Sequence, residues 1–90
     1  MNLVLDGKKV QLARSRWGGL LIKAWDGRRY ETYDCLSVHL EGADEGCVFL
    51  DVNSHMLRWL IENNVGILTG KTGTIEDVYG VTFPELKLNI

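Results

Sequence analysis

The chain has 90 residues, of which 46% are hydrophobic and 24% are charged, and its formal net charge is −2. This composition is that of an ordinary globular domain and excludes an intrinsically disordered chain. A domain of this size buries only about 60–65% of the surface of its unfolded chain, which leaves little room for a deep catalytic cleft. We therefore expect a single domain over residues 1–90.

Nothing in the sequence predicts a membrane or secreted protein. No apolar run approaches the roughly 20 residues that cross a bilayer, and the first ten residues lack the basic start and apolar run of a secretion signal. Cys35 and Cys47 are too few for a disulfide scaffold and form no C-x-x-C pair. We therefore expect reduced thiols and a cytoplasmic protein.

The charges are distributed unevenly along the chain. Residues 1–29 hold seven basic and two acidic residues, net +5, whereas residues 30–90 hold three basic and ten acidic residues, net −7. Such a split marks a surface for a charged partner or, more commonly in a compact domain, two halves that complement each other. The sequence leaves both interpretations open.

Two Asp-Gly pairs predict hairpins in the first third of the chain. Asp6–Gly7 and Asp26–Gly27 each offer the positive-φ pair that a tight two-residue turn requires. Gly18–Gly19 breaks the chain between the two hairpins. We expect strands at residues 2–5, 10–16, 20–25 and 29–40.

Alternating polarity predicts which residues of the next two strands face the core. In the fourth strand, Leu36, Val38 and Leu40 alternate with Cys35, Ser37 and His39, which predicts an apolar face and a more polar one. An acidic, turn-rich loop follows at residues 41–46, and a fifth strand is expected at residues 47–52. There the same period points Val48, Leu50 and Val52 inward and Cys47 and Phe49 outward.

One helix is predicted at residues 53–64, with the sequence NSHMLRWLIENN. Asn53 or Ser54 can accept hydrogen bonds from the exposed N–H groups of the first turn. Asn63, Asn64 and Gly66 end the helix, because Asn and Gly tolerate the left-handed conformation at a helix C-terminus. The apolar residues at helical spacing form one stripe that we expect to lie against a sheet: Met56, Leu57, Leu60 and Ile61.

The C-terminal residues have strand-like stretches at 77–83 and 86–90. Pro84 cannot donate a hydrogen bond there, which favours a sheet edge or a bulge. The predicted fold is therefore α+β: a twisted, mainly antiparallel sheet of five to seven strands with one short helix packed on it. Short connections favour strands that pair in sequence order.

The segment VGILTGKTGT, residues 65–74, is similar to a phosphate-binding loop. A true loop of that kind has four residues between its first glycine and the Gly-Lys pair and opens a helix, whereas Gly66 and Gly70 are separated by three and strands are expected to follow. ATP or GTP hydrolysis is excluded on this basis. An anion-binding nest formed by Gly70, Lys71, Thr72 and Gly73 remains a hypothesis, and a plain surface turn is the alternative.

Catalytic and metal-binding patterns are weak in this chain. Cys35, His39, Cys47 and His55 supply four soft ligands, but their spacing matches no zinc knuckle, so we expect no metal and no other cofactor. The serines lie in no G-x-S-x-G elbow, and neither histidine has a context that identifies it as a base. We therefore expect no enzyme.

Aromatic and basic residues are interleaved in the first third. Such residues together favour binding hot spots and also stack on single-stranded nucleic acid, but the acidic chain argues against nucleic-acid affinity. Core packing is the expectation for at least two of the three tryptophans, and Trp59 on the helix could join the core or lie at its margin. The candidate binding residues are Trp17, Trp25, Arg28, Arg29, Tyr33 and Phe49.

The second half of the chain resembles a known sequence pattern. A strand ending in a Val-Asp-like or Val-Asn-like pair leads to a short helix, an Asn-Gly-like stop, a T-G-x-T-G turn and a final G-x-x-x-P segment. Here these features lie at residues 48–53, in the helix through Asn64, and at 69–73 and 80–84, while residues 20–40 resemble the preceding hairpin more loosely. The pattern is similar to a small domain family of unknown function encoded by gut bacteria, their phages and conjugative elements.

The resemblance implies a context and carries no catalytic or ligand residues. It implies a small accessory protein of a mobile element that acts by binding, for which inhibition of a host defence system is a common role. We therefore expect a non-enzymatic protein that contacts a host or phage protein. A protein that sequesters a small phosphorylated ligand is the alternative, and an edge near Pro84 or the outer sheet face could pair two copies.

Overall fold

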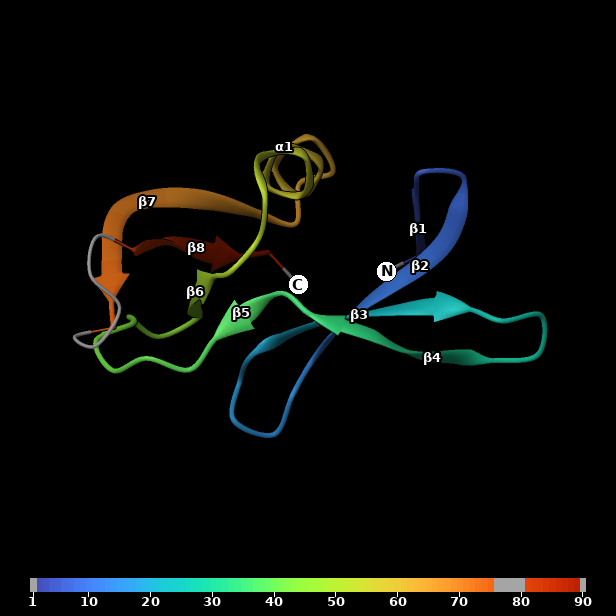
Figure 1. Ribbon diagram of the computed structural model, residues 1–90, viewed down its shortest axis with the longest axis horizontal. Helices are drawn as coiled ribbons and strands as arrows, with labels where there is room; N and C mark the ends of the chain where they lie inside the picture. The colour runs from blue at the N-terminus through green and yellow to red at the C-terminus, as the bar shows by residue number, and fades with distance from the viewer. Residues whose placement is uncertain (1, 76–80, 90) are drawn as a thin grey trace.

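The computed structural model describes residues 2–75 and 81–89. Within them the chain forms two antiparallel four-stranded sheets, which lie side by side, and one helix above them (Figure 1). The α+β class is confirmed, but the strands divide between two sheets and do not form one sheet of five to seven. The elements are β1 (Asn2–Leu5), β2 (Lys8–Arg14), β3 (Leu20–Trp25), β4 (Tyr30–Cys35), β5 (Ser37–Val38), β6 (Cys47–Leu50), α1 (Ser54–Glu62), β7 (Gly66–Thr74) and β8 (Thr82–Leu88).

Sheet A is a meander with the strand order β1-β2-β3-β4, so its strands pair in sequence order as predicted. Its first turn is the predicted two-residue turn at Asp6–Gly7, where both residues have positive φ angles, of 49° and 81°. The second turn is wider than predicted, because Trp25 pairs with Tyr30 and leaves a four-residue loop. The Asp26 carboxylate stabilises this loop by accepting hydrogen bonds from the N–H groups of the third and fourth loop residues, at 2.8 and 2.9 Å.

The predicted fourth strand is divided between the two sheets. β4 ends at Cys35 and β5 begins at Ser37, so the buried Leu36 stands at the junction. Its N–H donates to the Leu20 carbonyl at 2.8 Å, and its carbonyl accepts from the Asp51 N–H at 2.9 Å. Ser37 was expected on a polar face but is buried. Its hydroxyl is satisfied there, because it accepts the Leu20 N–H at 2.8 Å.

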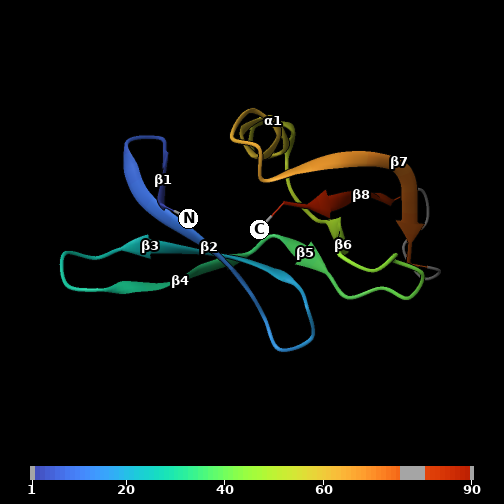
Figure 2. The same ribbon diagram turned by 180° about the vertical axis from the view of Figure 1, so that it is seen from behind.

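Sheet B has the strand order β5-β6-β8-β7. The glycine-rich segment expected to be a turn is the edge strand β7, which bends at a register shift between Leu68 and Thr72 (Figure 2). Gly70 lies within this shift and has a φ of 91°, a conformation that favours glycine. Of the strand predicted at 77–83, residues 77–80 lie outside the described residues, and β8 begins at Thr82.

Pro84 was predicted to lie at a sheet edge or a bulge. β8 is a central strand, so the edge is wrong, whereas the register shift of β7 beside Pro84 agrees with the second alternative. The position is nevertheless compatible with proline. β8 pairs with β6 only over Glu85–Lys87, and Pro84 lies opposite Thr72 where the register shift of β7 ends. The missing N–H therefore lies outside the hydrogen-bond ladder between β8 and β6, and beside the irregular part of the ladder between β8 and β7.

A single hydrophobic cluster joins the two sheets and the helix. Each sheet therefore buries its apolar face against the other sheet and the helix. The buried residues of this core cluster are Leu5, Val10, Leu12, Leu20, Ile22, Leu36, Val48, Leu50, Leu60, Val65 and Leu86.

Phe49 was predicted to point outward, but only 2% of its surface is exposed. It lies on the face of sheet B opposite the core cluster, and the bent half of β7 covers it there. A Cβ atom at Gly73 would lie 3.1 Å from both Phe49 and Leu40, so these three residues meet closely. The predicted alternation of faces along β6 was correct, but the edge strand β7 bends over the second face of sheet B and covers it.

Helix α1 begins and ends as predicted. The Asn53 Oδ1 atom accepts the Met56 N–H at 2.8 Å, and Asn64 has a φ of 56°. Its buried stripe is rotated from the predicted one: Ile61 is 41% exposed, whereas the half-buried Trp59 packs against the core cluster and donates its indole N–H to the Val4 carbonyl at 2.9 Å.

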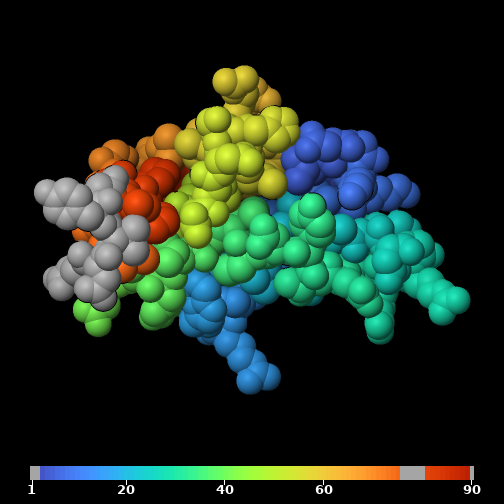
Figure 3. Space-filling view, viewed as in Figure 1, coloured from blue at the N-terminus to red at the C-terminus, as the bar shows by residue number. Residues whose placement is uncertain are grey.

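Helix α1 therefore contacts the β1–β2 hairpin of sheet A, beside which it lies in the space-filling view (Figure 3). Among the described residues, no helix has the length and apolar character needed to cross a bilayer.

Candidate binding sites

Along the strands of sheet A, the residues of one face point toward the core cluster, and the alternate residues form the opposite face of the sheet. We call these alternate residues the outer face of sheet A. Their cross-strand pairs are regular, for example Val4 with Lys9, Gln11 with Lys23 and Trp25 with Tyr30. The described side chains of the outer face are Val4, Lys9, Gln11, Ala13, Leu21, Lys23, Trp25, Tyr30, Thr32 and Cys35. This set contains two lysines and no carboxylate, so the face is basic.

An aromatic pair lies at one end of the outer face. The rings of Trp25 and Tyr30 are opposite each other on β3 and β4, with centroids 5.1 Å apart and planes at 57°. Trp25 is 44% exposed and Trp17 is 46% exposed, so the expectation of two tryptophans in the core is wrong. Only Trp59 among the three packs against the core cluster, because the helix carries it over the sheet whereas the other two lie at or beyond the ends of β3.

The other predicted binding residues are distributed over separate parts of the structure. Arg28 and Arg29 are exposed in the loop next to Trp25, where Arg29 forms a 2.9 Å ion pair with Glu31. Tyr33 is exposed at the bulge of β4 and lines a small cavity together with core-side residues of sheet A, with the Lys8 ammonium 5.9 Å from its ring centroid. Trp17 lies in the loop between β2 and β3.

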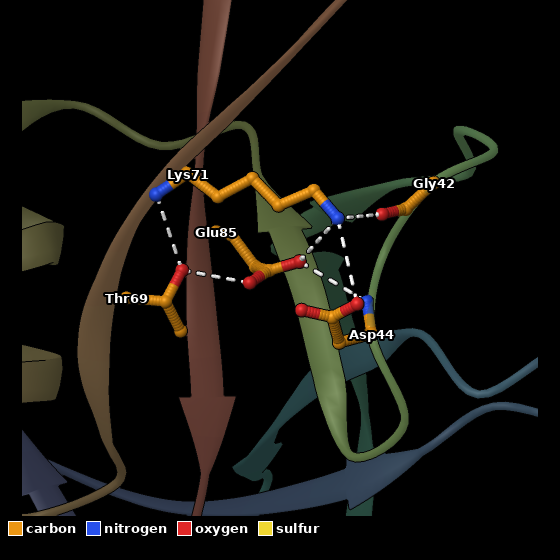
Figure 4. A network of polar contacts seen from close by, with 5 residues as sticks. All are labelled: Gly42, Asp44, Thr69, Lys71 and Glu85. Atoms are coloured by element: carbon orange, nitrogen blue, oxygen red, sulfur yellow. Dashed lines mark hydrogen bonds and ion pairs between the residues drawn. The ribbon is translucent and has the colours of Figure 1, made fainter.

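The cation of the predicted anion-binding segment is engaged by groups of the protein itself. The Lys71 ammonium donates to the Gly42 carbonyl and lies 3.5 Å from the Asp44 carboxylate and 4.0 Å from the Glu85 carboxylate (Figure 4). The Lys71 N–H donates to the Thr69 hydroxyl oxygen at 3.2 Å. A phosphate bound here would face two carboxylates, which is unfavourable.

Glu85 is the centre of this network and was not flagged by the sequence. Its side chain is completely buried, and it accepts hydrogen bonds from the Thr69 hydroxyl at 2.7 Å and the Asp44 N–H at 3.1 Å. The Thr69 hydroxyl, then the Asp44 N–H and the Lys71 ammonium, lower the pKa of Glu85 against the opposing effect of burial. The glycine-rich segment thus holds a buried carboxylate and the acidic loop in place. No local signal marks a buried glutamate, since a strand glutamate usually faces water.

A pocket of about 200 Å³ lies where the two sheets meet, between the β2–β3 loop and the segment at residues 38–49. We call it the junction pocket. His39 and Trp17 form part of its lining and contact each other edge to face, with ring centroids 4.9 Å apart. Burial, followed by the carboxylates of Glu85 and Asp44, raises the pKa of the Cys47 thiol in this lining. The thiol is therefore protonated at neutral pH, which disfavours a role as nucleophile.

The four soft ligands noted in the sequence have separate partners. His55 lies 3.1 Å from Asp6, and the Cys35 thiol donates to the Ser37 carbonyl at 3.3 Å. Over residues 2–75 and 81–89, no group of three or more His, Cys, Asp or Glu side chains could hold a metal ion.

Comparisons with protein-family models, with curated proteins and with solved structures gave no match. Roles for these surfaces therefore come from their geometry and chemistry.

Proposed function

We propose that this chain is a non-enzymatic binding protein that docks a partner protein on the outer face of sheet A. The observation that carries the proposal is the pair of the exposed Trp25 and the half-buried Tyr30, on a face with Lys9 and Lys23 and no carboxylate. Tryptophan and tyrosine are enriched in interface hot spots, since they bury a large area and retain a polar group for hydrogen bonding.

The distribution of charge along the chain favours an acidic partner for sheet A. Residues 2–35 hold seven basic and four acidic residues, net +3, whereas residues 36–90 hold three basic and eight acidic residues, net −5. Charge complementarity of this kind steers association and selects the docking face more than it adds affinity. The partner surface is therefore an apolar hollow that accepts Trp25, surrounded by carboxylates.

In the setting that the sequence resemblance implies, this chain is an accessory protein of a phage or mobile element. Its partner is then a host defence protein that it inhibits by occupying a functional surface. The alternative of a phosphorylated small ligand at Gly70–Gly73 is less favourable, because the Lys71 ammonium already lies beside two carboxylates.

The test is a capture experiment with a bacterial host lysate and native mass spectrometry of the bound species. The double variant Trp25→Ala with Tyr30→Ala should lose the partner, with an affinity reduced by about 30-fold or more. Ile67→Ser is the matched control, because Ile67 is an exposed apolar residue of sheet B and its variant should bind like the wild type. Capture of nucleic acid, or of a protein that the double variant retains, would contradict the proposal.

A further inference from the structure

We propose that the junction pocket binds a small aromatic carboxylate. This site is separate from the outer face of sheet A and does not depend on the proposed function. The pocket has a volume of about 200 Å³. Six or seven water molecules occupy this volume in the liquid, at roughly 30 Å³ each, so the pocket suits a ligand of one or two rings. The exposed ring of Trp17 forms one wall for such a ring, and Val38 and Leu40 are among the other apolar residues of the lining.

The wall formed by Trp17 is positioned by the glycines that follow it. Gly18 has a φ of 88°, and a Cβ atom at Gly19 would lie 2.8 Å from a ring carbon of Trp17, so the ring lies directly against this backbone. The Gly19 N–H donates to the Ser15 hydroxyl at 2.9 Å, which closes the loop. His39, which directly follows β5 of sheet B, then contacts the Trp17 ring. The aromatic wall is therefore preorganised before any ligand binds.

Arg14 supplies the cation for a carboxylate. Its Nε–H donates to the Gly18 carbonyl at 2.9 Å, which orients the guanidinium and leaves its two terminal amino groups for a bidentate contact. In the part of the chain that the structure describes, no carboxylate forms an ion pair with Arg14.

The other ionisable groups of the pocket do not cancel this preference for an anion. The Asp44 carboxylate lies 3.5 Å from the Lys71 ammonium, which offsets part of its charge. The Cys47 thiol is neutral, since its carboxylate neighbours oppose ionisation. A planar acid can therefore place its carboxylate on Arg14 and its ring against Trp17.

The experiment is a titration of the ¹⁵N-labelled protein with benzoate, followed by backbone amide chemical shifts. Benzamide and benzylamine are the neutral and cationic controls. We expect saturable shifts with benzoate confined to residues 15–19 and 38–49, and weaker or absent shifts with the two controls. Arg14→Gln should weaken benzoate binding about tenfold or more, because a charge-assisted hydrogen bond is lost.

Two further variants separate this site from nonspecific binding. Arg58→Gln removes an exposed arginine on helix α1, outside the pocket lining, and should leave benzoate affinity unchanged. Trp17→Leu keeps the charge but removes the aromatic wall and should also weaken binding, which provides a second test if Arg14→Gln does not fold. Equal binding of benzylamine, shifts spread over sheet A, or no saturation with benzoate below its solubility limit would overturn the proposal.

Discussion

The substitution Leu60→Ala tests whether the helix and both sheets share one core. Leu60 is fully buried in the core cluster, together with Leu5 of sheet A and Leu86 of sheet B. Truncation of a buried leucine costs about 2–5 kcal/mol through lost burial and the cavity left behind. A 90-residue domain has a free energy of unfolding of about 5–13 kcal/mol, so the variant loses a large part of it. The Tm should fall by about 4–8 °C for each kcal/mol lost.

Urea unfolding of Leu60→Ala, followed by far-UV circular dichroism and tryptophan fluorescence, measures this loss. Both signals should change in one coincident transition, because the cluster couples the two sheets. Ile61→Ala is the matched control on the same helix, and its cost should stay below about 1 kcal/mol since Ile61 is partly exposed. A loss below about 1 kcal/mol for Leu60→Ala, or two separate transitions, would refute a shared core.

Three further substitutions test the local features of the fold. Glu85→Gln should be less stable than the wild type at neutral pH, and the difference should vanish on acidification. Because the pKa of Glu85 is lower in the folded protein than its usual value of 4.5, the ionised carboxylate stabilises the fold above pH 4.5. This stabilisation is lost as the pH falls through the pKa of the folded state. Thermal unfolding from pH 7 downward measures this, and parallel curves would disprove it. Asn53→Ala should cost about 1 kcal/mol in urea unfolding through loss of the N-cap, whereas Ser54→Ala, the neighbouring control, should cost less. Gly66→Ala should cost about 1–3 kcal/mol, because the added Cβ would clash with the Lys87 carbonyl; an unchanged Tm would contradict this contact.

Local sequence signals predicted the features that depend on a few neighbouring residues. The Asp6–Gly7 turn, the Asn53 cap and the left-handed Asn64 each satisfy backbone groups within a few positions of themselves. The second hairpin shows the limit of such signals. Asp26 has the same Asp-Gly sequence as the first turn, but its carboxylate accepts hydrogen bonds from backbone N–H groups and stabilises a longer loop.

The candidate sites were harder to predict than the elements. Trp25 and Arg28 are exposed as expected of binding residues, but Phe49 is buried by a strand that the sequence suggested to be a turn. Lys71 was predicted to bind an anion from outside the protein, but its ammonium lies 3.5 Å from Asp44 and 4.0 Å from Glu85, which are both distant in sequence. The junction pocket likewise brings the loop at Trp17 together with His39, which follows β5 of the other sheet.

The sequence by itself determined the strand-rich α+β class, the single helix with its caps, the first tight turn and the meander of the first four strands. Only the tertiary structure decided that Leu36 divides a long strand between two sheets, that β7 folds over Phe49, and that Lys71 lies beside both Asp44 and Glu85. The physical reason is the range of the interactions. Caps and turns satisfy hydrogen bonds between neighbours in the chain, whereas sheet membership and the burial of a face depend on which distant segment covers it.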